Sequence, residues 1–288
     1  MRVAALNIYP IKGTRAASLE RAHLQPRGFE GDRRWVVVDA TGKFITQRSH
    51  QRLATVAARP AANGLVLTAP GMENLLVATP SGRERLDIVV WADQVNAALA
   101  DSQAHAWFSA LFGERLMLAH LDEKADRKKT GIWVAEPIPL SFADAFPVLV
   151  ATTGSLVALN AEVAARGGAA IPMTRFRPNL VVECDEPWRE DFWKVLRVGQ
   201  VELELMKPSD RCIVTTTDQT TGERMGEEPL KSLARLRMSG DRRINGVLFG
   251  WNAAPKTLGE IAVGDEVQVL EARPEGFPIR RARDAVIA

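Results

Sequence analysis

Residues 201–212 read Val-Glu-Leu-Glu-Leu-Met-Lys-Pro-Ser-Asp-Arg-Cys, a stretch that predicts both a β-strand and a chemically reactive position. The first six residues are rich in valine, leucine and glutamate and predict a strand over Val201–Met206. Lys-Pro-Ser-Asp at 207–210 is predicted to end that strand. We therefore expect Cys212 to begin the next element at the mouth of a loop.

The chemistry of Cys212 depends on its neighbours. Arg211 is adjacent and Lys207 is close in sequence, and both favour the thiolate, the form of cysteine that binds a metal or attacks an electrophile. The alternative is an inert, small hydrophobic side chain. The second cysteine, Cys184, precedes Asp185 and Glu186, whose negative charge should raise its thiol pKa and disfavour a thiolate.

Two further segments carry clustered cations. Arg175-Phe176-Arg177-Pro178-Asn179 runs directly into the strand expected at Leu180–Glu183. Two arginines spaced by two at a strand edge should project to one face, where they can hold a phosphate or carboxylate; ordinary surface ion pairs remain the alternative. In the N-terminal segments Tyr9–Gly13 and Asp32–Trp35, Lys12 follows a proline that could expose its ammonium in a cleft.

The remaining periodicity predicts a β-rich protein with few helices. In the first third, short strands suggest a small antiparallel barrel or sandwich, with a hairpin turn at Ala40–Lys43. The strands are expected at Val3–Ile8, Trp35–Asp39, Phe44–Gln47, Leu65–Thr68, Leu75–Ala78 and Leu86–Trp91. A helix is expected at Ser102–Phe112, capped by Asp101 and ended by Gly113.

The second half mixes both periodicities. The charged stretch Asp122–Thr130 is either a linker or a solvated surface turn. Beyond it we expect a helix capped by Thr153 and a second helix near Pro229–Leu236. Strands are expected at Val195–Val198 and on both sides of a turn within Ile261–Leu270.

Composition narrows the class of protein. With 288 residues, 46% of them hydrophobic, the chain can fill two packed subdomains and shows no disorder signature. A formal net charge of +2 argues against nucleic acid as a partner. The two cysteines support neither a disulfide framework, a zinc site nor an all-cysteine iron–sulfur cluster. We read no secretory signal and no membrane span, so a cytoplasmic location is expected.

The order of the motifs resembles the MOSC family, named after the C-terminal domain of molybdenum-cofactor sulfurases. Tyr-Pro-Ile-Lys, Asp-Arg-Arg-Trp, Phe-Arg-Pro-Asn and Ser-Asp-Arg-Cys follow one another as in the branch of amidoxime-reducing components and their bacterial relatives. Phe142-Ala143-Asp144, Ser155-Leu156 and Val263-Gly264-Asp265 agree with it. The resemblance extends from Ile8 to Leu270.

This resemblance implies a β-rich α+β fold in which an N-terminal antiparallel β-barrel-like domain packs on a MOSC β-barrel domain with peripheral helices. The corresponding division is 1–95 for the N-terminal domain, 96–130 for a connecting helix and loop, 131–272 for the MOSC domain and 273–288 for a tail. It also implies a molybdenum cofactor, molybdopterin, with Cys212 as the metal ligand and the catalytic residue. The residues implied to contact this cofactor are Lys12, Arg33, Ser155, Arg177, Asn179, Asp210, Arg211 and Cys212.

Two positions depart from the family pattern. Asp210 stands where relatives often have serine, and Gly13 replaces the serine common after the lysine. The expected consequence is an altered set of cofactor contacts.

The activity implied is reduction of small N-hydroxylated compounds, namely amidoximes, hydroxylamines and hydroxylated purines, by removal of oxygen at molybdenum. Electrons are expected from a separate protein of ferredoxin, flavodoxin or cytochrome type with its reductase, because the tail contains no cysteine for a cluster. An alternative is a molybdenum-cofactor or sulfur carrier that uses Cys212 as a persulfide. Pyridoxal phosphate is disfavoured because no lysine is evident for a Schiff base and no corresponding domain is present.

Overall fold

The segment from 201 onward forms one long strand, β17 (Val201–Arg211), in a computed structural model of the chain that describes residues 1–280. Val201, Leu203 and Leu205 are buried, whereas the intervening glutamates are partly exposed. The strand continues five residues beyond the predicted end because register shifts at Leu205/Lys207 and Pro208/Asp210 accommodate the proline. The predicted end of this strand at Met206 was therefore wrong.

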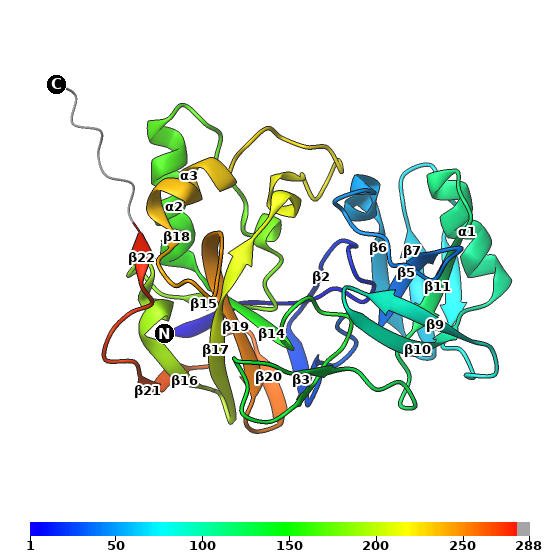
Figure 1. Cartoon of the computed structure of the whole chain (residues 1–288), viewed down its shortest axis with the longest axis horizontal. Coiled ribbons are helices and arrows are strands. Elements are labelled where there is room, and N and C mark those ends of the chain that lie inside the picture. Colours follow the sequence, from blue (N-terminus) through cyan, green and yellow to red (C-terminus); the bar gives the residue numbers. More distant parts are fainter. Residues whose placement is uncertain (281–288) are drawn as a thin grey trace.

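Strand β17 belongs to a ten-stranded sheet, whose main path runs β2-β1-β15-β14-β19-β17-β16-β21. Its strands are β1 (Arg2–Ile8), β2 (Ala17–Leu19), β14 (Val148–Thr152), β15 (Leu180–Glu183), β16 (Trp193–Val198), β17, β18 (Met238–Ser239), β19 (Val247–Pro255), β21 (Val267–Ala272) and β22 (Ile279–Arg280). A three-stranded sheet lies beside it, formed by β3 (Arg21–Gln25), β4 (Gly28–Phe29) and β20 (Gly259–Ala262). Together these sheets build the body on the left of Figure 1.

The other body, on the right of Figure 1, contains two small antiparallel sheets and one helix. One sheet consists of β5 (Trp35–Asp39), β9 (Arg85–Val90), β10 (Asp93–Leu99) and β11 (Leu116–His120). The other consists of β6 (Ala57–Ala61), β7 (Gly64–Thr68) and β8 (Leu75–Ala78). A two-stranded pair, β12 (Lys128–Lys129) and β13 (Ile138–Pro139), lies in the connecting segment.

The helices are short and peripheral, as expected. They are α1 (Ser102–Phe112), α2 (Thr153–Ala165), α3 (Leu230–Leu236) and the 3₁₀ turns η1 (Gln51–Thr55), η2 (Met173–Phe176), η3 (Arg189–Phe192) and η4 (Ile213–Thr216). Helix α1 has the predicted bounds: Asp101 accepts a hydrogen bond from the Ala104 amide, and Gly113 is left-handed at a φ of 75°. Helix α2 begins at Thr153 and its cap is Thr152, one residue earlier than the predicted cap.

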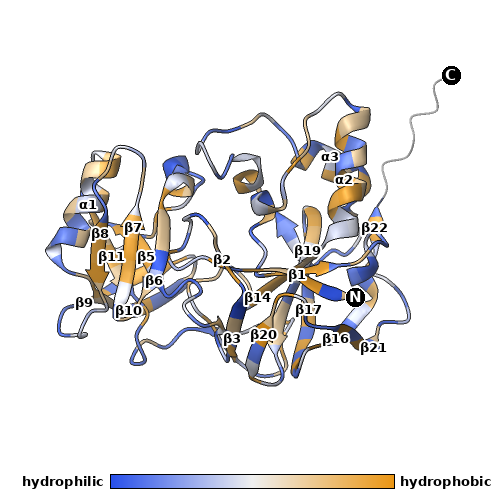
Figure 2. Cartoon of the chain, turned by 180° about the vertical axis from the view of Figure 1, so that it is seen from behind, coloured by the Kyte–Doolittle hydropathy of each residue, from blue (hydrophilic) through white to orange (hydrophobic). Residues whose placement is uncertain are grey.

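Each body has its own apolar interior, and Figure 2 shows hydrophobic residues concentrated along the strands. Trp193, Trp251 and Leu203 lie in the core of the larger body. Trp35 and Phe108 lie in a core of the smaller one, against α1. The β-rich architecture with few helices confirms the expected fold class.

The two bodies do not divide the chain at one residue, and the domain division predicted at residue 95 stays a prediction. Strand β1 pairs antiparallel with β15, and β3 pairs with β20, so the first strands of the chain lie in the larger body. The loop at Ile11 already packs into the core of the smaller body, and the chain enters its sheets with β5. This exchange places Tyr9 and Lys12 at the junction between the bodies, where the cavity described below lies. Of the predicted tail 273–288, residues 281–288 lie outside the described residues.

The hairpin predicted around residues 40–43 forms only in part. Phe44 makes an isolated bridge to Val38, while β5 pairs along its length with β11. The Asp39 carboxylate closes the turn by accepting from the Thr41 and Lys43 amides at 2.8 and 3.1 Å. The residues after Phe44 leave the sheet and reach the cavity. A regular second strand would have kept these residues in the sheet.

Candidate functional site

Cys212 lies at the point where β17 gives way to the 3₁₀ turn η4, as the sequence predicted. It occupies the cap position of η4, and its carbonyl accepts from the Thr215 amide at 3.0 Å. Its thiol is half-buried and lines a cavity. Cys184 is buried elsewhere, against the core of the larger sheet, where burial and the nearby acidic groups raise the pKa of its thiol. The acidic surroundings predicted for Cys184 are therefore present in the structure, and burial adds to their effect.

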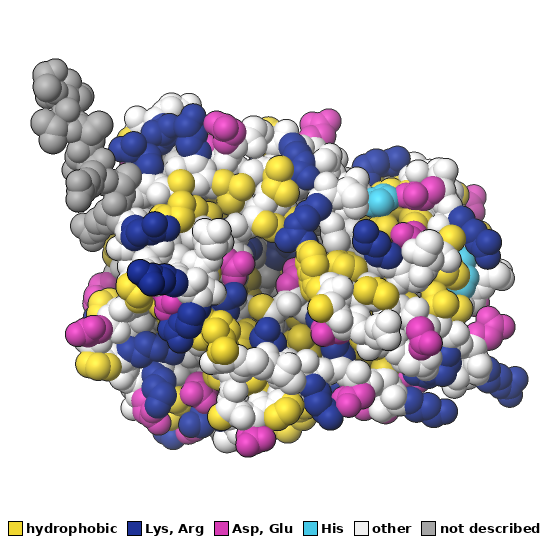
Figure 3. All heavy atoms as spheres, in the orientation of Figure 1, with side chains coloured by type: hydrophobic (Ala, Val, Ile, Leu, Met, Phe, Trp, Pro, Cys, Tyr) yellow, Lys and Arg dark blue, Asp and Glu magenta, His cyan; other side chains and the backbone are white. Residues whose placement is uncertain are grey.

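The cavity has a volume of about 390 Å³ and lies between the two bodies, in the hollow visible near the centre of Figure 3. Among the described residues, seven lysine and arginine side chains line it against two aspartates. The chain as a whole is nearly neutral, so positive charge is concentrated here. Such an excess of cations favours an anionic ligand.

Seven of the eight predicted contact residues meet at this cavity although they come from distant parts of the chain. They are Lys12, Arg33, Arg177, Asn179, Asp210, Arg211 and Cys212. They lie around the junction of β1, β15 and β17 with the loops that enter the smaller body. The eighth residue, Ser155, does not reach the cavity.

Ser155 lies in a closed cluster at the start of α2. Its hydroxyl contacts the Glu190 carboxylate at 2.7 and 2.9 Å and accepts from the Trp188 amide at 2.8 Å. The side chain is fully buried. Its hydroxyl is therefore hydrogen-bonded within the protein. This corrects the expectation that Ser155 contacts the cofactor, because Ser155 does not line the cavity.

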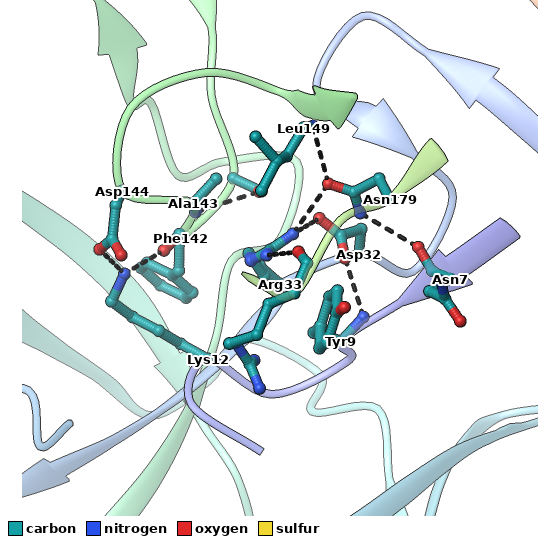
Figure 4. A network of polar contacts seen from close by, with 12 residues as sticks. Asn7, Tyr9, Lys12, Asp32, Arg33, Phe142, Ala143, Asp144, Leu149 and Asn179 are labelled. Atoms are coloured by element: carbon teal, nitrogen blue, oxygen red, sulfur yellow. Dashed lines mark hydrogen bonds and ion pairs between the residues drawn. The ribbon is translucent and has the colours of Figure 1, made fainter. Parts of the chain in front are cut away.

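Arg33 and Arg177 are fixed against the same aromatic ring. Their guanidinium carbons lie 4.5 and 4.1 Å from the ring centroid of Tyr9. Arg33 also pairs with the buried Asp32 carboxylate at 2.6 Å and donates to the Asn179 side-chain oxygen at 3.2 Å (Figure 4). Burial raises the pKa of Tyr9 to about 12 and lowers the pKa of Arg177 to about 10. The ring therefore stays neutral, and both arginines remain charged at neutral pH.

Arg175 does not share a face with Arg177, which corrects the prediction from their spacing. The segment is a 3₁₀ turn and not an extended strand edge, and Arg177 has a left-handed φ of 56°. Arg175 instead donates to the Thr216 carbonyl at 2.9 Å and contacts Asp218 at 3.5 Å. It supports the loop after Cys212, whereas Arg177 lines the cavity.

Backbone strain is concentrated at this cavity. Four non-glycine residues among the described ones have a positive φ: Arg33, Trp91, Arg177 and Trp188, at 50°, 58°, 56° and 62°. All except Trp188 line the cavity. Left-handed conformations cost free energy for residues with a Cβ and occur preferentially at functional sites.

Lys12 is almost fully buried at one side of the cavity. Its ammonium donates to the Phe142 carbonyl at 2.7 Å and contacts the Asp144 carboxylate (Figure 4). Burial lowers the pKa of Lys12 to about 8, although Asp144 opposes this shift. Desolvation alone would raise the pKa of Asp144, but Lys12 and the Trp91 indole hold it well below its usual range. The result is an ion pair whose lysine titrates just above neutral pH.

Arg211 and Asp210 flank the cysteine. Arg211 donates to the Ser209 hydroxyl at 2.8 Å and to the Phe176 carbonyl at 2.6 Å, and its buried Nε has no partner among residues 1–280. Burial lowers the pKa of Arg211, which remains a cation at neutral pH. Asp210 pairs with Lys207 at 2.5 Å.

The sequence argument missed two residues that contact these groups. The Arg48 Nη2 atom lies 3.3 Å from the Cys212 sulfur, and its guanidinium lies 4.6 Å from the centroid of Trp91. The indole N–H of Trp91 donates to Asp144 at 2.9 Å. Both come from the smaller body, and no sequence motif marks either one. Asp144 was noted only as part of a motif.

The described residues contain no group of three or more His, Cys, Asp or Glu side chains that could hold a metal ion. A metal in this cavity would therefore have Cys212 as a single soft ligand and would need further donors from a non-protein group. No helix in the described part is long and apolar enough to cross a membrane.

Comparison with known proteins defines the class to which this fold and cavity belong. Residues 1–115 match the MOSC N-terminal beta barrel domain, and residues 137–268 match the MOSC domain. The chain thus belongs to the proteins that carry a MOSC N-terminal beta barrel domain followed by a MOSC domain.

Its curated relatives include mitochondrial amidoxime-reducing components. Component 1 of Xenopus laevis is 27% identical over 283 residues, covering 92% of this chain and 81% of that protein. Component 2 of Bos taurus is 29% identical over 280 residues, covering 92% and 82%. Component 2 of Homo sapiens is 28% identical over 279 residues, with the same coverage.

Proposed function

We propose that the chain is a molybdenum-cofactor-dependent reductase of small N-hydroxylated compounds that receives electrons from a separate redox protein. The observation that carries this proposal is the half-buried thiol of Cys212 in a cavity lined by seven cationic side chains. The names of the relatives support the same reaction class.

The residues present fit a molybdenum cofactor. A thiolate is a soft ligand, and a pterin dithiolene group carrying a phosphate would supply the further sulfur donors and a negative charge. The buried Nε of Arg211, which lacks a partner among residues 1–280, and the Arg33 and Arg177 forks offer donors around such a group. A cavity of about 390 Å³ is in the range of small-molecule sites.

Each residue would have a defined task at this site. Cys212 would bind the metal, while Arg33, Arg177 and Arg211 would hold the anionic part of the cofactor. Lys12 Nζ holds a proton at pH 7, because its pKa is about 8. When bound, the cofactor supplies a redox-active metal that accepts oxygen from an N–OH group. Tyr9 would orient both arginines and Asp32 would orient Arg33; neither Tyr9 nor Asp32 lines the cavity.

Metal analysis together with turnover tests this proposal. Protein from a host that makes molybdopterin should contain about one molybdenum per chain and essentially no iron, because the site offers one thiolate. It should reduce benzamidoxime when given a reduced viologen dye in place of the protein donor. A chain that lacks molybdenum and carries a persulfide on Cys212 would instead support the carrier alternative and contradict the reductase proposal.

A further inference from the structure

A second groove adjoins the cavity on the side of the smaller body. It has a volume of about 380 Å³ and shares Thr46, Arg48 and Trp91 with the cavity. Phe44 and Val89 supply its apolar surface. A molecule in this groove would therefore lie next to the cavity that contains Cys212.

Trp91 forms a fixed aromatic wall between the two spaces. Its ring is 45% exposed, although tryptophan is usually more buried. The ring is nevertheless held by an edge-to-face contact with Phe44 at 4.9 Å and by the hydrogen bond to Asp144 at 2.9 Å. Its backbone is left-handed because Trp91 is the first residue of the two-residue turn between β9 and β10, and this turn fixes the position of the side chain. An exposed, rigid aromatic face is suited to stacking on a flat ligand.

Arg48 contributes a positive charge that no carboxylate of residues 1–280 pairs with. Within residues 1–280 its guanidinium forms no salt bridge, and it contacts only the Trp91 ring and the Cys212 sulfur. Lys43 is the other charged side chain that lines the groove, and no carboxylate lines it. Asp144 faces the cavity, where it is paired with Lys12. The groove therefore repels cations and attracts anions.

We propose that this groove is the substrate subsite, in which Trp91 stacks on the ring of a planar aromatic N-hydroxylated compound and Arg48 selects for neutral or anionic substituents over cationic ones. The inference rests on the proposed function and deepens it by naming the substrate class. Trp91 and Arg48 are specificity-determining residues in this arrangement. The N–OH group would extend from the groove toward Cys212.

Three amidoximes with the same reacting group test the proposal: benzamidoxime with a para-carboxylate, benzamidoxime with a para-aminomethyl group, and acetamidoxime. For the holoenzyme, KM should be about tenfold lower for the para-carboxylate than for the para-aminomethyl compound. Acetamidoxime should bind weakest. Trp91→Ala should raise KM for both aromatic compounds about tenfold and change KM for acetamidoxime by less than about twofold. Arg48→Ala should remove the preference of kcat/KM for the carboxylate over the aminomethyl compound.

Two variants separate stacking from other effects. Trp91→Phe keeps a flat ring but loses the N–H that contacts Asp144, so KM for the aromatic compounds should stay within about threefold of the unmodified enzyme. Trp133→Ala is the matched control, because Trp133 stacks on Arg243 at 4.3 Å and does not line either space. It should leave all three KM values unchanged. Equal effects of Trp91→Ala on aromatic and aliphatic substrates would overturn the proposal.

Direct binding distinguishes failure of the subsite from failure of the proposed reaction. In titration calorimetry, the unreactive 4-carboxybenzamide should bind the unmodified chain and Trp133→Ala equally, but bind Trp91→Ala about tenfold more weakly. This result, combined with no reduction of any amidoxime, would reject the reductase and retain an aromatic-acid site. Turnover without selective loss in Trp91→Ala, or binding that is equal in all variants, would reject the subsite.

Discussion

The cavity that contains Cys212 and the closed cluster around Ser155 both hold buried polar side chains, but the charges of these side chains are neutralised to different degrees. In the closed cluster, Glu190 accepts from Ser155 and Thr152, and burial raises the pKa of its carboxyl. All three side chains are essentially inaccessible. At the cavity, Arg33 and Arg177 have protein partners but also line open space with a surplus of positive charge. A residue's place in a sequence motif therefore does not show that it binds a ligand. An open cavity lined by an excess of positive charge is the stronger indication of a ligand site.

The largest effect is expected at Cys212, the thiol that faces the cavity. Cys212→Ser replaces a soft sulfur ligand by a hard oxygen, so reductase activity should fall by about a hundredfold or more and the metal's absorption spectrum should change. Pterin can remain bound through the arginines. Cys184→Ser is the matched control, because that thiol is buried in the larger body and should not affect either quantity. Molybdenum, pterin and turnover are measured for both variants, and an active Cys212→Ser enzyme would falsify the assignment.

Arg177 should give the next largest effect. A charge-assisted hydrogen bond contributes about 1.5–3 kcal/mol, so Arg177→Ala should weaken cofactor retention about ten- to a hundredfold. Arg189 is half-exposed at the surface of the larger body and forms a weak pair with Glu186 at 3.6 Å. Arg189→Ala should therefore retain the cofactor as the unmodified chain does. Pterin content after gel filtration compares the two, and equal loss would remove the anion-holding role of Arg177.

Lys12 should make cofactor uptake depend on pH. Its folded-state pKa is about 8, lowered by burial, so the ammonium loses its proton as the pH rises through 8. Uptake of an anionic cofactor by the cofactor-free chain should then weaken about tenfold between pH 7 and 9, because the neutral amine offers no charge. Lys12→Arg remains charged over this range and should abolish the decrease. Affinity that is independent of pH in the unmodified chain would show that Lys12 does not face the anion.

Some strands and helices could be predicted from the sequence because the residues that begin and end them are neighbours in the chain. Strand β15 has the predicted bounds, and α1 lies between the predicted cap residues Asp101 and Gly113. The long-range arrangement was not predictable in this way. Arg48 contacts both Cys212 and Trp91 through tertiary packing between the bodies, and nothing adjacent to Arg48 in sequence indicates these contacts. The family resemblance brought Lys12, Arg33 and Arg177 together, which periodicity alone could not have done.

The two wrong site expectations have physical reasons. Spacing by two places residues on one face only in extended backbone, and Arg177 adopts a left-handed conformation after a 3₁₀ turn. The hydroxyl of Ser155 lies at a helix start, where serine and threonine commonly satisfy neighbouring protein groups. Each expectation failed because a local structural role replaced the predicted ligand contact.

Ser155→Ala should have the smallest effect on the cavity, but it should lower the free energy of unfolding. Ser155→Ala leaves the Trp188 amide and the Glu190 carboxyl with one fewer buried partner each, which costs about 1–3 kcal/mol in the free energy of unfolding. Cofactor retention and KM should stay unchanged, because the cluster does not line the cavity.

Glu190→Gln sharpens the same test through pH. The raised pKa of buried Glu190 means that the folded state holds its proton at pH values where the unfolded chain has lost it, so stability falls as the pH rises between the unfolded and folded pKa values. A glutamine cannot titrate, and this part of the pH dependence should disappear. Thermal unfolding followed from pH 4 to pH 8 measures it beside pterin content. If either variant loses the cofactor while its melting temperature is unchanged, the cluster communicates with the cavity and the contrast between the two regions is wrong.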